Sequence, residues 1–137
     1  MRYLAIDYGP KRTGLAICDC SETITSPLAI IPDSKHLLKK ITDIIEAEDV
    51  DGLVLGLPLN MDGSEGPQAK LVYDFARELK KLVNIPIHFQ DERLSTFAAE
   101  EKLGPADFTR NKKKKRLDAV AAAQILEAFL EAKHSGE

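Results

Sequence analysis

The sequence predicts an α/β fold with a central mixed sheet of five strands and helices on both faces of that sheet. Short apolar runs with the length of strands are followed, later in the chain, by longer segments whose apolar residues recur at helical spacing. One run, residues 52–57, is continuously apolar, which is typical of a strand covered on both faces. The five predicted strands are residues 3–6, 14–18, 24–31, 52–57 and 85–89.

Residues 3–19, YLAIDYGPKRTGLAICD, predict a hairpin at the start of the chain. Its first strand is too apolar to be half-exposed and too short for a stable helix, and it ends at the carboxylate of Asp7. Burying an ionised carboxylate costs several kcal/mol unless a positive charge compensates it, and the candidates are a bound cation, Lys11 and Arg12. Asp7 is therefore either a structural ion-pair or capping residue, or a metal ligand that needs carboxylates from elsewhere in the chain.

The third strand contains Pro27, which favours a position at the edge of the sheet. A helix follows, and Asp33 or Ser34 is placed to cap its first turn. An intervening helix makes the next strand, residues 52–57, parallel to its predecessor. The predicted apolar stripe of the helix is Leu37, Leu38, Ile41, Ile44 and Ile45.

The loop at residues 58–66 is rich in turn-forming residues, and Pro67 suits the first position of a second helix. The part from Asn60 to Gly63 has two interpretations, and both are kept. It is a tight structural turn, or its backbone N–H groups meet a phosphate. The predicted apolar side of the second helix is Val72, Phe75, Ala76, Leu79 and Leu82.

The fifth strand, residues 85–89, runs directly into Glu92, so a carboxylate again stands at the end of a strand. A short helix is predicted next, and a long final helix follows over residues 117–129. The predicted boundaries of the short helix are a cap at Ser95 or Thr96 and an end at Gly104 and Pro105.

Asp118 stands near the start of the final helix. At 100° per residue it lies within about 40° of Ala122 and about 20° of Ile125, on the side that faces the sheet. It is either a third metal ligand or an acid that simply interacts favourably with the helix dipole. With Asp7 and Glu92 it forms a candidate site for Mg²⁺ or Mn²⁺, since hard cations choose oxygen ligands and bridge to phosphate.

Length and composition indicate one globular domain over residues 1–137. Hydrophobic residues make up 44% and charged residues 30% of the chain, and no apolar run approaches the roughly 20 residues of a membrane-spanning helix. No targeting segment is recognised, so we expect a cytoplasmic protein with no membrane partner. Cys18 and Cys20 are too close in an extended strand for an easy disulfide, and they lack the further ligands that zinc needs.

Charge indicates a nucleic-acid partner only after it is localised. The 19 basic and 22 acidic residues give a net charge of −3, but residues 110–116 hold six basic residues and no acid. This basic run is either a solvated face or a clamp that brings a phosphate backbone to Asp118. Aromatic residues make up only 6% of the chain, too few for a platform on which the bases of a single strand stack. Structured or duplex nucleic acid therefore fits better.

Four ordered segments of the chain resemble the YqgF/RuvX family, which is similar to Holliday junction resolvases within the ribonuclease H-like superfamily. They are AIDYGPKRTGLAICD at 5–19, LGLPLNMDGSEGPQA at 55–69, DERLST at 91–96 and RLDAVAAAQILEAFL at 116–130. The resemblance covers nearly the whole chain. It implies a ribonuclease H-like fold and a metal-dependent nuclease for precursor small-subunit ribosomal RNA or for Holliday junctions.

The resemblance also implies roles for individual residues. Asp7, Glu92 and Asp118 take the catalytic and metal-binding places with Mg²⁺ or Mn²⁺. Apart from the resemblance, Asp91, Asp62 and Glu65 are further candidates for the third ligand if Asp118 is a structural residue. The expected partner is structured RNA or branched DNA, bound by a monomer or weak homodimer. The resemblance places Lys11, Arg12, Arg93 and the loop from Asn60 to Glu65 around the substrate. The charge of the basic run adds the expected substrate-binding residues Arg110, Lys112, Lys113, Lys114, Lys115 and Arg116.

Two other functions are kept at this point. The glycine turn between the hairpin strands also resembles the phosphate loop of sugar and acetate kinases, although those enzymes close two such domains around ATP. The other alternative is a module that binds nucleic acid without catalysis. An assay for metal-dependent cleavage distinguishes such a module from an enzyme.

Overall fold

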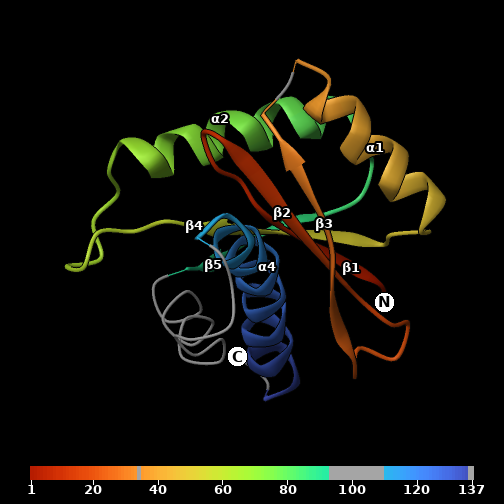
Figure 1. Ribbon diagram of the computed structural model, residues 1–137. Coiled ribbons are helices and arrows are strands. Elements are labelled where there is room, and N and C mark those ends of the chain that lie inside the picture. The colour runs from red at the N-terminus through yellow and green to blue at the C-terminus, as the bar shows by residue number, and fades with distance from the viewer. Residues whose placement is uncertain (34, 93–109, 136–137) are drawn as a thin grey trace.

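The structure is a computed structural model that describes residues 1–33, 35–92 and 110–135, with side chains in the last segment from residue 120 onward. Five strands form one mixed sheet, as the sequence predicts, and their order is β3-β2-β1-β4-β5 (Figure 1). The strands are β1 (Tyr3–Asp7), β2 (Arg12–Cys18), β3 (Thr25–Pro32), β4 (Gly52–Leu57) and β5 (Ile87–Asp91).

The pairing brings the carboxyl ends of three strands to the same end of the sheet. β1 and β2 form the predicted antiparallel hairpin, and β3 continues it at the edge. β4 pairs in parallel with β1 on one side and with β5 on the other. Because parallel strands end on the same side, the carboxyl ends of β1, β4 and β5 lie together.

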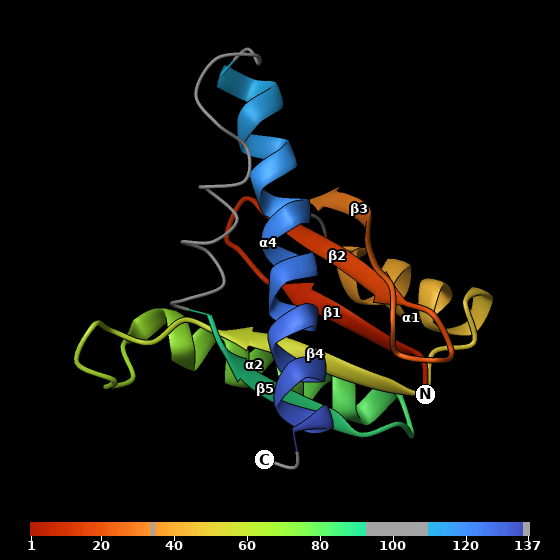
Figure 2. The same ribbon diagram turned by 90° about the horizontal axis from the view of Figure 1, so that it is seen from below.

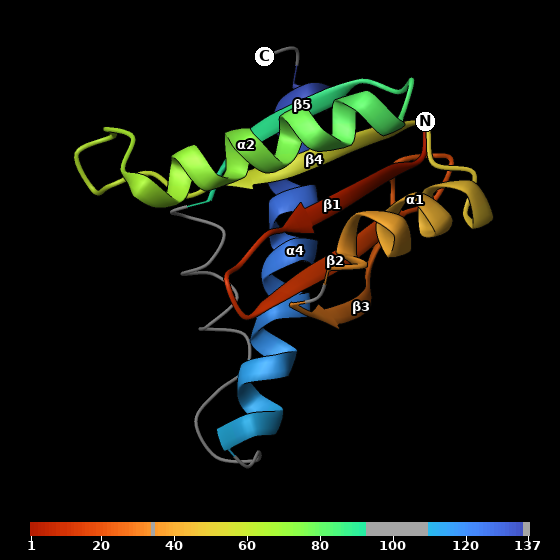
Figure 3. The same cartoon turned by 90° about the horizontal axis from the view of Figure 1, so that it is seen from above.

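Helices cover both faces of the sheet. α1 (Leu37–Ala47) and α2 (Pro67–Leu82) lie on one face, and α4 (Arg110–His134) crosses the other (Figures 1 and 3). α4 contacts all five strands, and its first turns extend beyond the sheet (Figure 2). No helix in the described part of the chain is both long and apolar enough to span a membrane.

Strand alternation divides the buried side chains into two layers. Leu4 and Ile6 of β1 pack with the residues of α1 and α2, whereas Tyr3 and Ala5 pack with α4. Val54 of β4 also belongs to the α4 side. Since successive side chains of a strand point to opposite faces, Asp7 and Gly56 continue the series on the α4 side.

Several local predictions are confirmed. Pro27 lies on the edge strand β3, opposite Ala16 at a register shift. Pro67 is the first residue of α2, and the apolar stripe of α1 is buried or packed against the core. Cys18 is buried, Cys20 is exposed, and both are free thiols.

Other local predictions are wrong, mostly at element ends. α1 begins only at Leu37, and its cap residue His36 makes no side-chain capping hydrogen bond, so Asp33 is too early to be the cap. Leu82, the last residue of α2, is 57% exposed rather than buried. β5 begins two residues later than expected. Pro86 has no N–H for a sheet ladder, and only its carbonyl is used, accepting from the N–H of Leu53.

The final helix begins earlier than predicted, at Arg110, and so includes the basic run. Lysine and arginine are good helix formers, which explains why the run continues the helix. Ser34 and the predicted short helix between Ser95 and Pro105 lie outside the described residues.

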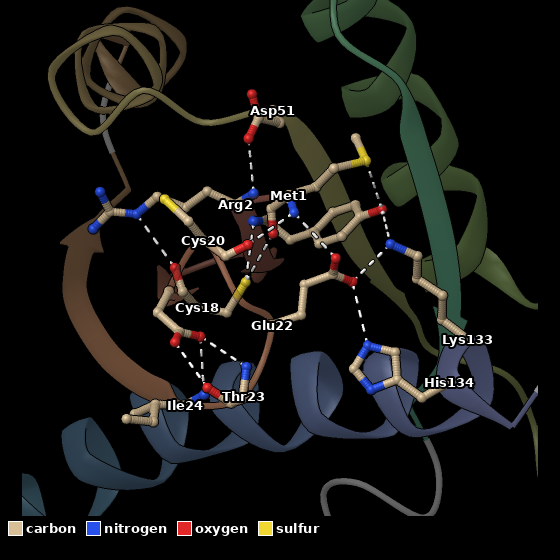
Figure 4. A network of polar contacts seen from close by, with 12 residues as sticks. Met1, Arg2, Cys18, Cys20, Glu22, Thr23, Ile24, Asp51, Lys133 and His134 are labelled. Atoms are coloured by element: carbon tan, nitrogen blue, oxygen red, sulfur yellow. Dashed lines mark hydrogen bonds and ion pairs between the residues drawn. The ribbon is translucent and has the colours of Figure 1, made fainter.

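Glu22, in the turn between β2 and β3, anchors the end of α4 (Figure 4). Its carboxylate contacts the amino group of Met1 at 3.0 Å, Lys133 Nζ at 2.6 Å and His134 Nε2 at 3.4 Å. The hydrogen bond from Lys133 is the largest cause that lowers the pKa of Glu22 to about 2. Lys133 also donates to the Tyr3 hydroxyl at 3.0 Å. The end of α4 is thereby held against the start of β1.

Candidate active site

Asp7 and Glu92 meet at the carboxyl ends of the parallel strands. Asp7 is the last residue of β1, and Glu92 follows β5 directly, with its N–H donating to the carbonyl of Leu57 at 3.1 Å. A hydrogen bond joins the two carboxyl groups. The end of β4 lies between the two strands, so all three parallel strands contribute to the position of this pair.

The environment of Asp7 strongly favours its protonated form. Burial is the largest cause, followed by the hydrogen bond to Glu92 and the charge of Glu92, and together they raise the pKa of Asp7 from 3.8 to about 9. Two carboxyl groups in contact cannot both be ionised at low cost, so a proton or a cation must lie between them. In the metal-free protein, the raised pKa of Asp7 therefore favours a proton on this pair.

Gly56 is a site residue that the sequence analysis missed. A Cβ on Gly56 would lie 2.5 Å from Cδ1 of Ile125 and 3.3 Å from Oε2 of Glu92. The absence of a side chain therefore lets α4 and the Glu92 carboxyl group approach β4 together. A glycine inside an apolar strand signals such a close approach, but the sequence does not say which group approaches.

Asp118 lies in the helix that covers this pair. Ile125, which touches Gly56, is completely buried, and the helical repeat places Asp118 on the same face about two turns earlier. The side chain of Asp118 lies outside the described ones. Its contribution to an acidic cluster with Asp7 and Glu92 stays a prediction.

Lys11 lies in the β1–β2 turn and is exposed, and Arg12 is the first residue of β2 and is partly buried. The turn is tight at Gly9, because a Cβ there would lie 2.7 Å from the carbonyl oxygen of Arg12. The carbonyl of Lys11 accepts from the N–H of Asp33 at 2.9 Å. The hairpin therefore holds two basic residues close along the chain to Asp7.

Asn60 has a structural role in the loop between β4 and α2. Its side-chain amide donates to Ser64 Oγ at 3.0 Å, and its backbone N–H donates to the Ser64 carbonyl at 2.9 Å. Asp62 Oδ1 accepts from both the N–H and the hydroxyl of Ser64. Gly63 completes the turn with a φ of 88°. The structural interpretation of this loop is therefore confirmed, and a contact with phosphate stays a prediction.

The remaining predicted site residues are placed only in part. Arg93 lies outside the described residues. The basic run occupies the first turns of α4, which extend beyond the sheet in Figure 2, but its side chains are not among the described ones. These side chains are Arg110, Lys112, Lys113, Lys114, Lys115 and Arg116.

The raised pKa of Asp7 predicts how stability depends on pH. Between the unfolded pKa of 3.8 and the folded value of about 9, Asp7 binds more protons in the folded protein than in the unfolded chain, so its contribution to stability falls as pH rises. Asp7→Asn keeps a hydrogen-bonding group without that titration. We expect similar melting temperatures of variant and parent near the low end of this range, and a more stable variant near its high end.

Calorimetry in the presence of a chelator measures this difference. Asp43→Asn is the matched control, because Asp43 is exposed on α1 and paired with Lys39. A constant difference in melting temperature between Asp7→Asn and the parent at every pH would contradict the assigned titration.

Comparisons with known proteins identify similar chains. The family model described as RuvX, Holliday junction resolvase, matches residues 1–132. A relative from Roseiflexus sp. (strain RS-1) is 44% identical over 133 residues, covering 95% of this chain and 94% of its own. A relative from Maridesulfovibrio salexigens is 41% identical over 132 residues, covering 95% and 98%. Both are named "Putative pre-16S rRNA nuclease".

Solved structures of resolvases share the fold. RuvC from Thermus thermophilus, in complex with a Holliday junction substrate, superposes with a TM-score of 0.64 at 12% identity and covers 99% of this chain and 97% of its own. The fowlpox virus Holliday junction resolvase gives a TM-score of 0.57 at 17% identity, covering 96% and 99%. The ribonuclease H-like fold predicted from the sequence is thereby confirmed.

Proposed function

Because this chain belongs to the RuvX family, we propose that it is a divalent-metal-dependent nuclease that cleaves structured RNA, the precursor of small-subunit ribosomal RNA. We further propose that it acts in the cytoplasm as a monomer or weak homodimer. The names of its relatives support the substrate, and the site supports the chemistry.

The contact between Asp7 and Glu92 carries the proposal. Two carboxyl groups joined at the ends of parallel strands are costly unless a proton or a cation lies between them. Their oxygen atoms suit Mg²⁺ or Mn²⁺, which keep several waters and bind through a few carboxylates and substrate phosphates. A bound ion of this kind supplies Lewis-acid activation of water and stabilises a leaving oxygen.

The residues of the chain have separate roles in this proposal. Asp7, Glu92 and Asp118 would hold the ion, and the proton on the Asp7–Glu92 pair must leave when the ion binds. Lys11 and Arg12, next to Asp7 in the chain, would orient the phosphate.

A metal response tests the proposed third ligand. Binding to the native state adds RT ln(1 + [L]/Kd), about 2.7 kcal/mol at a hundredfold excess over Kd, so Mn²⁺ should raise the melting temperature of the parent. Asp118→Asn should leave the metal-free protein nearly unchanged or more stable, because it removes a like charge, and should reduce the Mn²⁺ response. Strong destabilisation without metal, with an unaltered Mn²⁺ response, would redirect the search to Asp91, Asp62 or Glu65.

The basic run in α4 is expected to position nucleic acid without selecting its sequence. Replacing Lys112 to Lys115 by glutamine should weaken binding to all sequences alike. It should also reduce the slope of log K against log salt, by roughly 0.7 to 0.9 for each phosphate that the protein no longer neutralises. Titrations at several salt concentrations measure the slope, with Lys39→Gln/Lys40→Gln on exposed α1 as the control. A slope equal to that of the parent would identify the run as a solvated face.

Cleavage assays test the substrate directly. The purified protein is incubated with Mg²⁺ or Mn²⁺ and either an RNA hairpin that spans a mature end of small-subunit ribosomal RNA or a four-way DNA junction. Cleavage of the RNA that requires both metal and Asp7 supports the proposal. Binding without cleavage of either substrate would favour the non-catalytic alternative.

Resolution of Holliday junctions is the second candidate function. The description of the matching family model favours it. Cleavage of the four-way DNA junction, with the RNA hairpin left intact, would select this function over RNA processing.

A further inference from the structure

Residues of α2 and β5 line a groove of about 770 Å³. α2 lies on the opposite face of the sheet from α4 (Figure 3). Its apolar lining includes Tyr73 and Ala76 of α2, Ile85, and Ile87 and Phe89 of β5. The rings of Tyr73 and Phe89 meet edge to face with centroids 5.1 Å apart, yet Phe89 remains 40% exposed. The groove therefore presents an exposed aromatic ring beside the edge strand β5.

The backbone of β5 offers hydrogen bonds along this groove. The carbonyl of Pro86 and the N–H of Glu92 both bond to β4, so the residues with even numbers direct their backbone groups toward β4. Ile87 and Phe89 therefore direct theirs to the other edge, where no described strand pairs with β5. The same two residues line the groove with their side chains.

The rim of the groove is positively charged. Lys70, Arg77 and Lys80 line it from exposed positions on α2. Arg77 is paired with Asp74, the acid on the same rim. Among the described residues, Lys70 and Lys80 have no ion-pair partner.

Three occupants compete for such a groove. A second copy of the chain pairing through β5 would bring its own lysines toward these lysines, which repel one another. A nucleic acid would use the lysines but leave the apolar lining uncovered. An extended acidic peptide uses the open strand edge, the apolar lining and the positive rim together.

We propose that the groove between α2 and β5 binds an acidic, extended segment of a partner protein, which adds as a strand to β5. Alternate apolar side chains of the segment enter the groove and pack on the exposed side of Phe89, and its acidic residues face Lys70 and Lys80. This site is separate from the nuclease site, so the proposal does not depend on the catalytic one.

The test uses a capped eight-residue peptide in which glutamate alternates with leucine. Addition of this peptide should shift the backbone amide resonances of Ile87 and Phe89 in ¹⁵N-labelled protein. Lys70→Glu/Lys80→Glu should weaken binding by roughly tenfold or more, and high salt should weaken binding to the parent. Lys39→Glu/Lys40→Glu, at exposed positions of α1, makes the same change of charge outside the groove. This variant should bind the peptide as the parent does.

A peptide in which lysine alternates with leucine supplies the reverse experiment. It should bind Lys70→Glu/Lys80→Glu more tightly than the parent, which also shows that the variant is folded. The proposal is overturned if both peptides bind the parent equally, or if the glutamate peptide leaves the β5 amides unshifted. It is also overturned if an RNA duplex shifts these amides and the glutamate peptide does not.

Discussion

Asp7→Asn is expected to reduce metal-dependent phosphodiester cleavage by at least roughly a hundredfold. Replacing a residue that merely supports a metal ligand reduces metal affinity or activity by about 10- to 100-fold, so replacing a direct ligand should reduce activity at least as much. The amide keeps the shape and the hydrogen bond of the protonated carboxyl group, but it lacks the charge that holds a cation. Cleavage rates of parent and variant on the same RNA at saturating Mn²⁺ measure the effect.

The melting temperature provides the control for this loss of cleavage activity. Because burial and the neighbouring Glu92 raise the pKa of Asp7 in the metal-free protein, the variant, which carries no charge, should melt at the parent's temperature or above. Asp43→Asn, the same change at an exposed position, should keep full activity. Equal cleavage by Asp7→Asn and the parent would remove Asp7 from the mechanism.

The strands and helices of this fold could be predicted because burial leaves a periodic trace in the sequence. Leu53 to Leu55 is buried on both faces and is correspondingly apolar throughout, and α1 shows the spacing of its buried stripe. Element ends were less predictable, because they depend on single hydrogen bonds rather than on periodicity. The carbonyl of Pro86 and the uncapped start of α1 are examples.

The acidic pair was predictable for a topological reason. Carboxylates at the ends of parallel strands meet at one sheet edge, so Asp7 and Glu92 could be brought together before any contact was known. The contact of Gly56 with Ile125 could not be foreseen, since it depends on the depth at which α4 packs across β4. The groove beside β5 was missed for a similar reason. Its lining comes from two elements whose residues look like ordinary core and surface positions.

Gly56→Ala is expected to reduce both stability and activity. The new Cβ would overlap Cδ1 of Ile125 at 2.5 Å and crowd Oε2 of Glu92 at 3.3 Å, so one or both must move. Overpacking of this kind costs about 1–3 kcal/mol of folding free energy. Displacement of the Glu92 carboxyl group should lower the cleavage rate by about 10- to 100-fold, because a shift of about 1 Å in a catalytic group has effects of that size.

A second substitution separates the two effects of Gly56→Ala. Ile125→Val removes Cδ1, the atom that the new Cβ meets, and alone costs about 0.5–1.5 kcal/mol. In Gly56→Ala/Ile125→Val the methyl groups no longer overlap, so the double variant should be more stable than the sum of the single effects predicts. Activity should recover as far as Glu92 returns to its place beside β4.

Gly52→Ala is the matched control, because its Cβ would lie 2.8 Å from the ring of Tyr3 at the other end of β4. It should lose stability but keep activity wherever it is folded. A full cleavage rate in Gly56→Ala would show that the close approach of α4 to β4 serves packing alone.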